Sequence, residues 1–472
     1  MRISKVVFAA WLVACSGPVA EQPRVQPSAA DPAATITPED MRARIAFLSS
    51  DDLRGRDTPS PGLDSAAAYI ARQFQSMGLR PGGENGTFYQ RYPYTIRTLS
   101  AAATWAGLRY ASDFFVWPGT PLNINGTLVA VNGELASIPA AQIRGQVPVV
   151  TIRGRMDRAW RTAVNSARNA AQLAGTTGLI VVVDSSVTEE NIQQAAASFR
   201  RTSTAAPLNS VAFVRPQAFE NAAGRVAIEI PATTVEHRPP NVAGILRGSD
   251  PALRDTYVVL SAHMDHVGVG APDARGDSIY NGADDDASGT SAVIEIAEAL
   301  ASVQPPARSV LFLLVSGEEK GLLGSRYYSD YPTVPITSIV GNINIDMIGR
   351  NAPDTVVAIG QEYSSLGPLM HELVRAHPEL GLTASRDLWP QERFFFRSDH
   401  FNFARKEIPA IFFFSGVHED YHRPSDEVAK INADKAARIA KLGYYLTREV
   451  ATRREAPQWT AQGLQEVRAL TR

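Results

Sequence analysis

Histidine and carboxylate side chains follow the apolar runs in the second half of this chain, at the points where those runs end. Taken alone, each group has an ordinary structural explanation, because a single buried histidine is usually a hydrogen-bonded core residue. Five groups at five successive boundaries instead indicate one site assembled at one edge of a sheet. In chain order the groups are His263 and Asp265, Asp284 to Asp286, Glu318 and Glu319, Asp346, and His418, Tyr421 and His422.

The residue types in these groups fit a zinc site. Zinc accepts imidazole nitrogen and carboxylate oxygen, and a position left open in its coordination admits water and substrate. The chain has one cysteine, Cys15, so a site built from several thiolates is excluded. Two zinc ions about 3.5 to 4 Å apart need one bridging carboxylate and roughly two further ligands each. The groups supply such a set.

Five segments also resemble, in order, the motifs of the M28 family of co-catalytic zinc aminopeptidases and carboxypeptidases. The resemblance covers about Thr256 to Asp426. The segments are Ser261-Ala262-His263-Met264-Asp265, Gly282-Ala283-Asp284-Asp285-Asp286-Ala287-Ser288-Gly289, Ser316-Gly317-Glu318-Glu319, Asn344-Ile345-Asp346-Met347-Ile348-Gly349 and Tyr421-His422-Arg423-Pro424-Ser425-Asp426.

The resemblance implies a role for each ligand. His263 and Asp346 are expected to bind one zinc ion, and Glu319 and His422 the other. Asp285 is expected to bridge the two ions. The expected cofactors are therefore two zinc ions, and the expected activity is hydrolysis of terminal peptide bonds with a bridging water.

The resemblance also implies supporting roles for neighbouring residues. Glu318 is expected to be the general base, which takes a proton from water and returns it to the leaving amine. Asp265, two residues after His263, is expected to hydrogen-bond and orient that imidazole. Asp286 is expected to follow Asp285 through a cis peptide bond, as in relatives.

Three further residues are predicted to contact substrate. Tyr421 and His400 are candidates for stabilising the oxyanion. Asp399 lies in Arg397-Ser398-Asp399-His400, where relatives contact substrate, and a structural partnership with His400 is an equal alternative.

The elements that must position these residues read as an α/β fold. The runs at 257–260, 310–315, 339–345 and 411–414 are short, continuous and rich in branched or aromatic residues, as in strands buried on both faces. Helices are predicted at 62–77, 288–300 and 434–447, with a capped start at Thr37. We therefore predict a mixed, mostly parallel sheet flanked by helices, the fold class of zinc exopeptidases, with an inserted β-rich α+β domain.

The chain divides into five predicted segments. Residues 126–234 contain no histidine and no cluster of metal-binding or nucleophilic residues. We therefore interpret them as an inserted domain, similar in position and pattern to a protease-associated (PA) domain. The peptidase domain comprises 37–125 and 235–455. Residues 1–15 are predicted to be a signal peptide, 16–36 a flexible tether rich in Pro, Ala and Gln, and 456–472 a C-terminal tail.

The pattern of the first fifteen residues predicts that the protein is exported from the cytoplasm. Arg2 and Lys5 precede an apolar run too short to span a bilayer, and Leu12-Val13-Ala14-Cys15 resembles a bacterial lipoprotein signal. We predict lipidation of Cys15 and a location at the bacterial outer membrane or periplasmic face. A soluble periplasmic or secreted protein is the alternative.

The net charge and the motifs limit which partners and which activities are expected of this protein. The net charge of -2 gives no reason to expect nucleic acid, so the predicted partner is a peptide, with membrane contact only through the lipid. An aminopeptidase is preferred over a carboxypeptidase because of its frequency in the family. The alternatives are a one-zinc enzyme like glutaminyl cyclase, which generally lacks the site of His263 and Asp346, and a non-catalytic receptor on the same fold.

Overall fold

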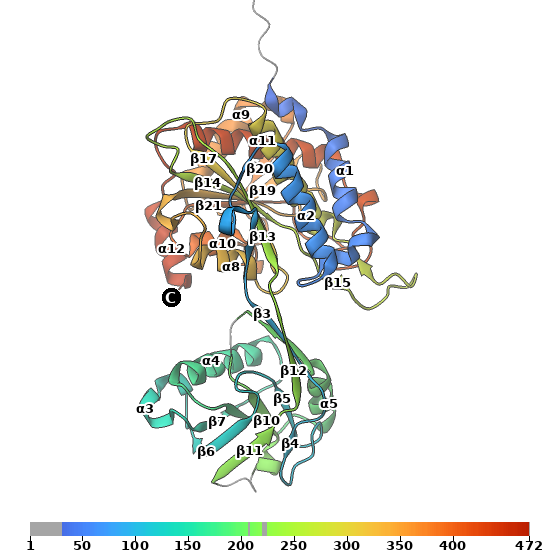
Figure 1. Cartoon of the computed structure of the whole chain (residues 1–472), viewed down its shortest axis with the longest axis vertical. Helices are drawn as coiled ribbons and strands as arrows, with labels where there is room; N and C mark the ends of the chain where they lie inside the picture. Colours follow the sequence, from blue (N-terminus) through green and yellow to red (C-terminus); the bar gives the residue numbers. More distant parts are fainter. Residues whose placement is uncertain (1–30, 206–207, 220–223, 472) are drawn as a thin grey trace, which may run out of the picture.

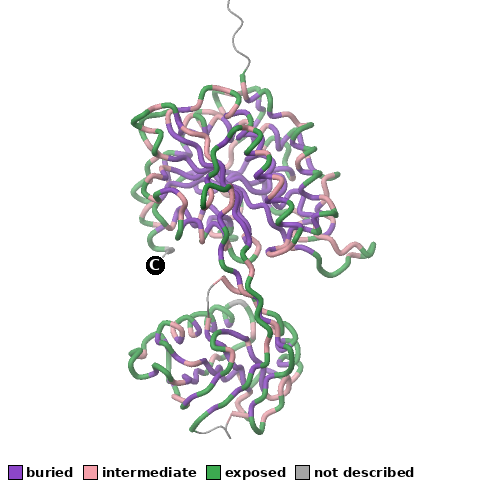
Figure 2. Tube along the Cα trace, viewed as in Figure 1, coloured by how far each residue is buried: buried purple, intermediate pink, exposed green. Residues whose placement is uncertain are grey.

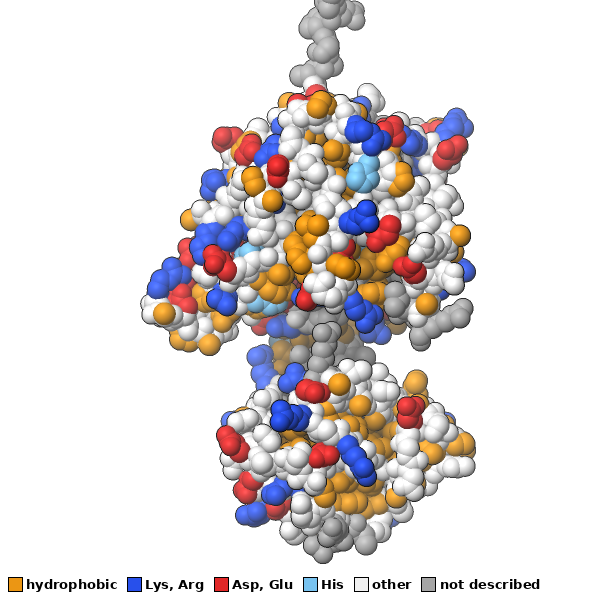
Figure 3. Space-filling model, turned by 180° about the vertical axis from the view of Figure 1, so that it is seen from behind, with side chains coloured by type: hydrophobic (Ala, Val, Ile, Leu, Met, Phe, Trp, Pro, Cys, Tyr) orange, Lys and Arg blue, Asp and Glu red, His pale blue; other side chains and the backbone are white. Residues whose placement is uncertain are grey.

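The computed structural model describes residues 31–205, 208–219 and 224–471, which form two bodies joined by a narrow ribbon of strands (Figure 1). The larger body holds both ends of the described chain, and the smaller one is inserted into it. The same waist separates the bodies when the molecule is seen from behind (Figure 3).

A nine-stranded mixed sheet forms the centre of the larger body. Its four central strands, β17, β14, β18 and β21, run parallel to one another. Strand β13 pairs antiparallel with β17 at one side of this group, and β19 pairs antiparallel with β21 at the other. The predicted α/β fold with a mixed sheet is thereby confirmed, but the sheet is not mostly parallel, because four of its eight strand pairings are parallel and four are antiparallel. In spatial order the strands are β1 (Arg80–Pro81), β13 (Pro240–Leu246), β17 (Ser309–Val315), β14 (Tyr257–His263), β18 (Ile339–Ile345), β21 (Ala410–Phe414), β19 (Thr355–Ile359) and β20 (Thr383–Ser385), with β2 (Tyr89–Arg91) paired to β13.

Helices cover both faces of this sheet, which leaves the central strands in the buried interior (Figure 2). Alternate residues of β14 face opposite layers. Val258 and Leu260 pack into one core, and Val259 packs into the other with Tyr328 and Phe403. The first face is covered by α1 (Pro38–Leu48), α2 (Pro61–Ser76), α7 (Gly289–Ala301), α9 (Leu366–Ala376) and α11 (Ala433–Thr452), and the second by α8 (Leu323–Asp330) and α10 (His400–Ala404).

Capping residues fix the starts of the first two long helices. The Thr37 side chain accepts a hydrogen bond from the backbone N–H of Asp40 at the start of α1, and Ser60 accepts from Leu63 at the start of α2. Each cap is followed by a proline, whose missing N–H costs nothing in the first turn of a helix. Between them the turn η2 (Asp51–Arg56) buries Arg56.

The inserted body is built on a seven-stranded sheet with a hydrophobic core on each face. Its strands in spatial order are β4 (Thr104–Trp105), β11 (Arg225–Glu229), β6 (Ile124–Ala130), β7 (Val147–Ile152), β8 (Leu179–Val183), β10 (Val211–Val214) and β5 (Phe114–Trp117). Its helices are α3 (Ala140–Ile143), α4 (Arg158–Ala174), α5 (Glu189–Ser198) and α6 (Pro216–Phe219).

A three-stranded ribbon connects the two bodies. Strand β3 (Tyr94–Leu99) pairs antiparallel with both β12 (Ala232–His237) and β9 (Arg201–Thr204). The segment His237-Arg238-Pro239-Pro240, predicted to be the hinge, lies where β12 ends and β13 of the larger sheet begins.

Three predicted boundaries differ from the structure. Strands β4 and β5 belong to the inserted sheet, so this body begins before residue 126, and its identification as a PA domain stays a prediction. The end of the predicted tether forms η1 (Pro32–Thr35), because Ala33 and Ile36 bury their side chains in the main core. The predicted tail contains α12 (Ala461–Thr471), which buries Val467.

No helix in the described ranges is long and apolar enough to cross a membrane. The predicted signal peptide, Cys15 and most of the predicted tether lie outside the described residues.

Candidate metal centre

The predicted ligands converge at the carboxyl ends of the parallel strands. His263 is the last residue of β14, Asp346 directly follows β18, and Glu319 lies four residues after β17. His422 lies in the loop after β21 with a φ of 55°, a left-handed backbone conformation. Asp285 lies in the turn η5 (Ala283–Ser288), which leads into α7. Parallel strands bring residues from distant parts of the chain to one edge, so this convergence follows from the fold.

The ligand atoms lie at the spacing expected around shared ions. His263 Nε2 is 3.3 Å from Asp285 Oδ1 and 3.6 Å from Asp346 Oδ1. His422 Nε2 is 3.1 Å from Asp285 Oδ2 and 3.1 Å from Glu319 Oε2. Atoms bonded tetrahedrally to one zinc ion at about 2.0 to 2.2 Å lie roughly 3.3 Å apart. Asp285 therefore presents one oxygen to each histidine, as a bridging carboxylate must.

Several of these buried atoms have no hydrogen-bond partner among the described residues. They include His422 Nε2, Asp346 Oδ1 and Glu319 Oε1. Unpaired polar atoms are costly in an interior, and a cation placed between them removes that cost. The residues present thus fit the predicted zinc ions.

The charges of the cluster also call for a cation. Burial alone would lower the pKa of His422, but Asp285 and Glu319 raise it to about 10. Burial would likewise lower the pKa of His263, and Asp346 and Glu318 raise it well above its usual range. Conversely, burial would raise the pKa of Asp285, and the surrounding histidines hold it well below the ordinary value. The carboxylates attract positive charge to the same points at which a metal would be bound.

The structure adds one residue that the sequence prediction missed. His266 is completely buried, and its Nδ1 lies 2.8 Å from Glu319 Oε1. Two groups of possible metal ligands emerge, His266 with Asp285, Glu319 and His422, and His263 with Asp286 and Asp346. His266 follows Asp265 directly, so its position in the first histidine motif was the available signal.

Asp286 supports the cluster from behind the bridging residue. The peptide bond between Asp285 and Asp286 is cis, as predicted. The Asp286 carboxylate accepts backbone hydrogen bonds from His263, Gly289 and Met347 at 2.8 to 3.2 Å. It therefore ties the end of β14, the start of α7 and the end of β18 together.

The predicted role of Asp265 needs correction. Its carboxylate Oδ1 lies 3.7 Å from His263 Nδ1, too far for a hydrogen bond, whereas its backbone carbonyl lies 3.2 Å from that nitrogen. A proton on Nδ1 leaves Nε2 free to bind metal. The carboxylate instead accepts hydrogen bonds from the Thr58 hydroxyl at 3.0 Å and the Glu318 backbone N–H at 3.2 Å. Asp265 orients the histidine through its main chain and Glu318 through its side chain.

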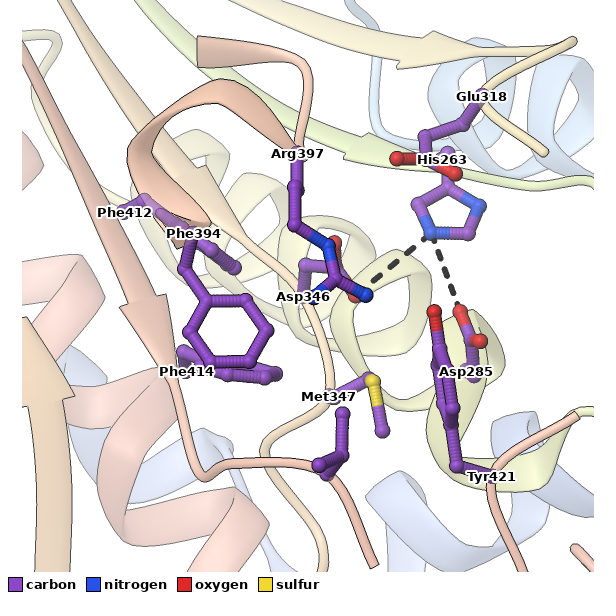
Figure 4. A pocket seen from close by; sticks show the side chains of 11 residues that line it. His263, Asp285, Glu318, Asp346, Met347, Phe394, Arg397, Phe412, Phe414 and Tyr421 are labelled. Atoms are coloured by element: carbon purple, nitrogen blue, oxygen red, sulfur yellow. Dashed lines mark ion pairs between the residues drawn. The ribbon is translucent and has the colours of Figure 1, made fainter. Parts of the chain in front are cut away.

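Glu318 lies beside the ligands and faces a pocket (Figure 4). Burial raises its pKa well above the ordinary value, although the charge of His263 opposes this shift. The pocket is lined by His263, Asp285, Glu318, Asp346, Met347, Phe394, Arg397, Phe412, Phe414, Val417 and Tyr421. The pocket is therefore lined by the candidate metal ligands and Glu318 together with aromatic and aliphatic side chains.

Of the predicted substrate contacts, Tyr421 lines this pocket, and its ring stacks on His422 with centroids 3.9 Å apart. Asp399 and His400 are completely buried and are not among the described residues that line it. The His400 ring packs against Phe395 and Phe412, and burial lowers its pKa to about 3. Asp399 accepts a hydrogen bond from Ser325. Both residues are placed as packing elements, and neither is placed to contact substrate.

The fold and the cluster together define an α/β protein with a candidate metal centre at the carboxyl ends of its parallel strands. The model of peptidase family M28 matches residues 241–447, so this part of the chain is similar to that family.

Curated relatives share shorter segments. A probable zinc metalloprotease of Pyricularia oryzae is 26% identical over 245 residues, covering 43% of this chain and 48% of the relative. Aminopeptidase YwaD of Bacillus subtilis is 33% identical over 112 residues, covering 24% and 22%. This chain therefore spans about half or less of the length of these two relatives.

Solved structures share the fold over a greater length. An aminopeptidase from Aneurinibacillus sp. strain AM-1 matches with a TM-score of 0.53 and 18% identity, over 91% of this chain and 96% of its own. A zinc aminopeptidase from Bacillus subtilis matches with a TM-score of 0.52 and 17% identity, over 89% and 97%. At these identities the likeness establishes the fold.

Proposed function

We propose that this protein is a zinc-dependent exopeptidase that hydrolyses terminal peptide bonds, acting as an aminopeptidase. The observation that carries the proposal is the convergence of histidine and carboxylate atoms, several of which have no hydrogen-bond partner among the described residues, beside Glu318, which lines the pocket. The names of two relatives, a probable leucine aminopeptidase of Arthroderma benhamiae and aminopeptidase YwaD, support the direction of attack.

In this proposal zinc ions, when bound, would polarise the scissile carbonyl and lower the pKa of water. His263, Asp346, Asp285, Glu319 and His422 would hold them. Glu318 accepts the proton of the attacking water and then donates it to the leaving amine, which is general base followed by general acid catalysis.

The pocket supplies the remaining interactions of the proposed reaction. Tyr421 lines the pocket, and in this proposal its hydroxyl donates a hydrogen bond to the developing oxyanion. The apolar wall, which includes Met347, Phe394 and Phe412, favours a hydrophobic side chain on the terminal residue of the substrate.

The two rival activities are less well supported by the site. His263 and Asp346 lie within the cluster, 3.6 Å apart, which favours a two-metal peptidase over a one-metal cyclase. The predicted base lies at the pocket beside the metal groups, which favours an enzyme over a receptor.

One observation supports a second candidate direction. Arg397 lines the pocket, with its guanidinium 4.7 Å from the Phe394 ring centroid and 3.4 Å from a Glu392 oxygen. An arginine at this position suits a substrate carboxylate, as a carboxypeptidase requires. Cleavage of free-amine peptides but not of amine-blocked peptides would support the aminopeptidase, and the reverse would support the carboxypeptidase.

Two adjacent glutamates allow a matched test of the mechanism. We expect Glu318→Gln to keep its zinc and to lose about 100- to 10,000-fold in turnover, because only the proton transfer is removed. We expect Glu319→Gln to lose zinc itself. Metal analysis and peptide hydrolysis on the same preparations separate the two. Near-normal turnover by Glu318→Gln would contradict its role as the base.

We further propose that the chain is exported and lipidated at Cys15, a residue outside the described ranges. Incorporation of radiolabelled lipid by the wild type, lost in Cys15→Ala, would support this. An unlipidated wild type would contradict it.

A further inference from the structure

His266 lies in the candidate metal centre, and its surroundings differ from those of a histidine that packs in a core or of one that is held by hydrogen bonds. Its ring is completely buried, and neither ring nitrogen has a hydrogen-bond partner within the described part of the chain. Nδ1 nevertheless lies 2.8 Å from Glu319 Oε1 and 3.7 Å from Asp285 Oδ2.

The short contact between His266 and Glu319 is informative because its geometry does not suit a hydrogen bond. The distance suits one, yet Nδ1 and Oε1 both count as unpaired among the described atoms. A contact of 2.8 Å whose geometry does not suit a hydrogen bond is expected when both atoms are directed at a third point, where an ion would be bound. His422 shows the same signature, since its Nε2 lies 3.1 Å from two carboxylate oxygens and is likewise unpaired.

A second buried histidine, His400, shows that unpaired ring nitrogens do not by themselves identify a metal ligand. Both ring nitrogens of His400 are also unpaired among the described residues, but its ring packs between the aromatic rings of Phe395 and Phe412. Unpaired nitrogens alone therefore do not indicate a metal. What distinguishes His266 is that its nitrogen faces two carboxylates and that its ring lies 5.5 Å from the ring of His422.

The backbone is shaped to admit the His266 ring. A Cβ added to Gly282 would lie 2.5 Å from His266 Cγ, closer than any side chain tolerates. Gly282 also has a φ of +60°, in the left-handed region that glycine adopts most readily. This glycine opens the turn that carries Asp285, so the imidazole and the bridging carboxylate can approach the same point.

We propose that His266 is a ligand of one of the two zinc ions, together with Asp285, Glu319 and His422. This inference rests on the proposed zinc function and goes beyond it, because it makes the two ions unequal. The ion held by these four side chains has a complete tetrahedral set, as structural zinc sites do. The ion held by His263, Asp346 and Asp285 keeps an open position.

The pocket agrees with this division. It is lined by His263, Asp285, Asp346 and Glu318, and the described lining does not include His266, Glu319 or His422. Substrate and water thus approach the ion with the open position. The four-ligand ion anchors the bridging carboxylate and is expected to be the more tightly bound of the two.

X-ray absorption at the zinc edge tests this proposal without an activity assay, because it counts imidazoles per ion. Wild type loaded with two ions should show three imidazoles for each pair of ions. After stepwise chelation to one ion per chain, the remaining zinc should show two imidazoles, those of His266 and His422. One imidazole on that ion would overturn the proposal.

Variants supply the second arm of the test. His266→Ala should weaken one of the two ions by more than the roughly 100-fold that loss of an outer-shell partner causes, and should leave one imidazole per bound zinc. His266→Gln, which retains most of the side-chain volume, should behave alike if both fold, as judged by circular dichroism. His418→Ala is the matched control, because the His418 side chain is only 3% exposed and its Nε2 lies 3.3 Å from Asp284 Oδ2, but His418 belongs to neither ligand group. It should keep both ions and all three imidazoles.

The possible failures are distinguishable. A wild type with two ions whose content and imidazole count are unchanged in both His266 variants would overturn the role of His266 alone. A wild type that binds no zinc would overturn the proposed function as well.

Discussion

Replacing Arg56 should destabilise the larger body more than any ordinary surface arginine does. Arg56 is 1% exposed, and its guanidinium donates to four backbone carbonyls, those of Leu48, Met264, Asn281 and Gly282. These carbonyls lie at the end of α1, directly after His263 and directly before η5, which contains Asp285. One side chain therefore joins the N-terminal helices to the loops of the metal centre.

The expected magnitude follows from those contacts. Arg56→Met leaves four buried carbonyls without their donor, and at about 1 to 3 kcal/mol for each buried polar group left unpaired the loss should be at least about 4 kcal/mol. Arg56→Lys keeps the charge but offers three donors to four carbonyls, so it should lose at least one charged hydrogen bond, about 1.5 to 3 kcal/mol. At roughly 2 to 4 °C per kcal/mol for a domain of this size, Arg56→Met should lower the Tm by about 10 °C.

Thermal unfolding in excess chelator is the appropriate assay, because the difference then reports the fold and not zinc binding. Arg453→Met is the control, since the Arg453 side chain is 43% exposed and its ion pairs with Glu449 and Glu372 are on the surface. It should change stability by less than about 1 kcal/mol. A Tm of Arg56→Met within 2 °C (roughly 1 kcal/mol) of that control would refute the reasoning.

Three further predictions concern the site and its surroundings. Asp265→Ala removes the acceptor of the Glu318 N–H, so kcat/KM should fall about 10- to 100-fold with zinc content retained, and unchanged kinetics would contradict the positioning role. Tyr421→Phe should lower kcat about 100-fold with little change in KM, and a loss confined to KM would remove Tyr421 as the oxyanion donor. Burial lowers the pKa of Lys435 to about 8 from 10.5, so between these values the unfolded chain binds a proton that the folded chain does not. The free energy of unfolding should therefore rise from pH 8 to 10.5 in wild type and less steeply in Lys435→Met, as denaturant titrations across that range would show.

The sequence predicted the convergence of the ligands because strand runs and polar groups alternate in a regular way. Each predicted central strand has a counterpart, for example 310–315 in β17 and 411–414 in β21, since strands buried on both faces must be continuously apolar. Once those strands are parallel, residues at their carboxyl ends meet without further assumptions. His263, Asp346 and Glu319 are close for that reason.

The errors lie where position along the chain does not determine contact. His266 was overlooked because a histidine beside a motif has the same type and spacing whether it faces the metals or the core. Asp265 was given the wrong bond because its backbone carbonyl and its carboxylate both lie near one imidazole, and only coordinates separate them. His400 was placed at the substrate, whereas its ring packs among phenylalanines.

The predicted domain boundaries differ from the structure for a related reason. Strand β5 pairs with β10, about 100 residues later in the chain, so its membership of the inserted sheet depends on a long-range pairing. The α12 helix is short, and among its described residues Gly463 and Val467 are buried. Neither contact leaves a periodic pattern that is strong enough to be read from composition.

Metal reconstitution tests the central claim most directly. The protein is stripped with a chelator, its metal content is measured, and hydrolysis of a free-amine peptide is followed while zinc is added back. A zinc-dependent aminopeptidase should be inactive when stripped and should reach full activity at two zinc ions per chain. Full hydrolysis by protein verified to be free of metal would contradict the account.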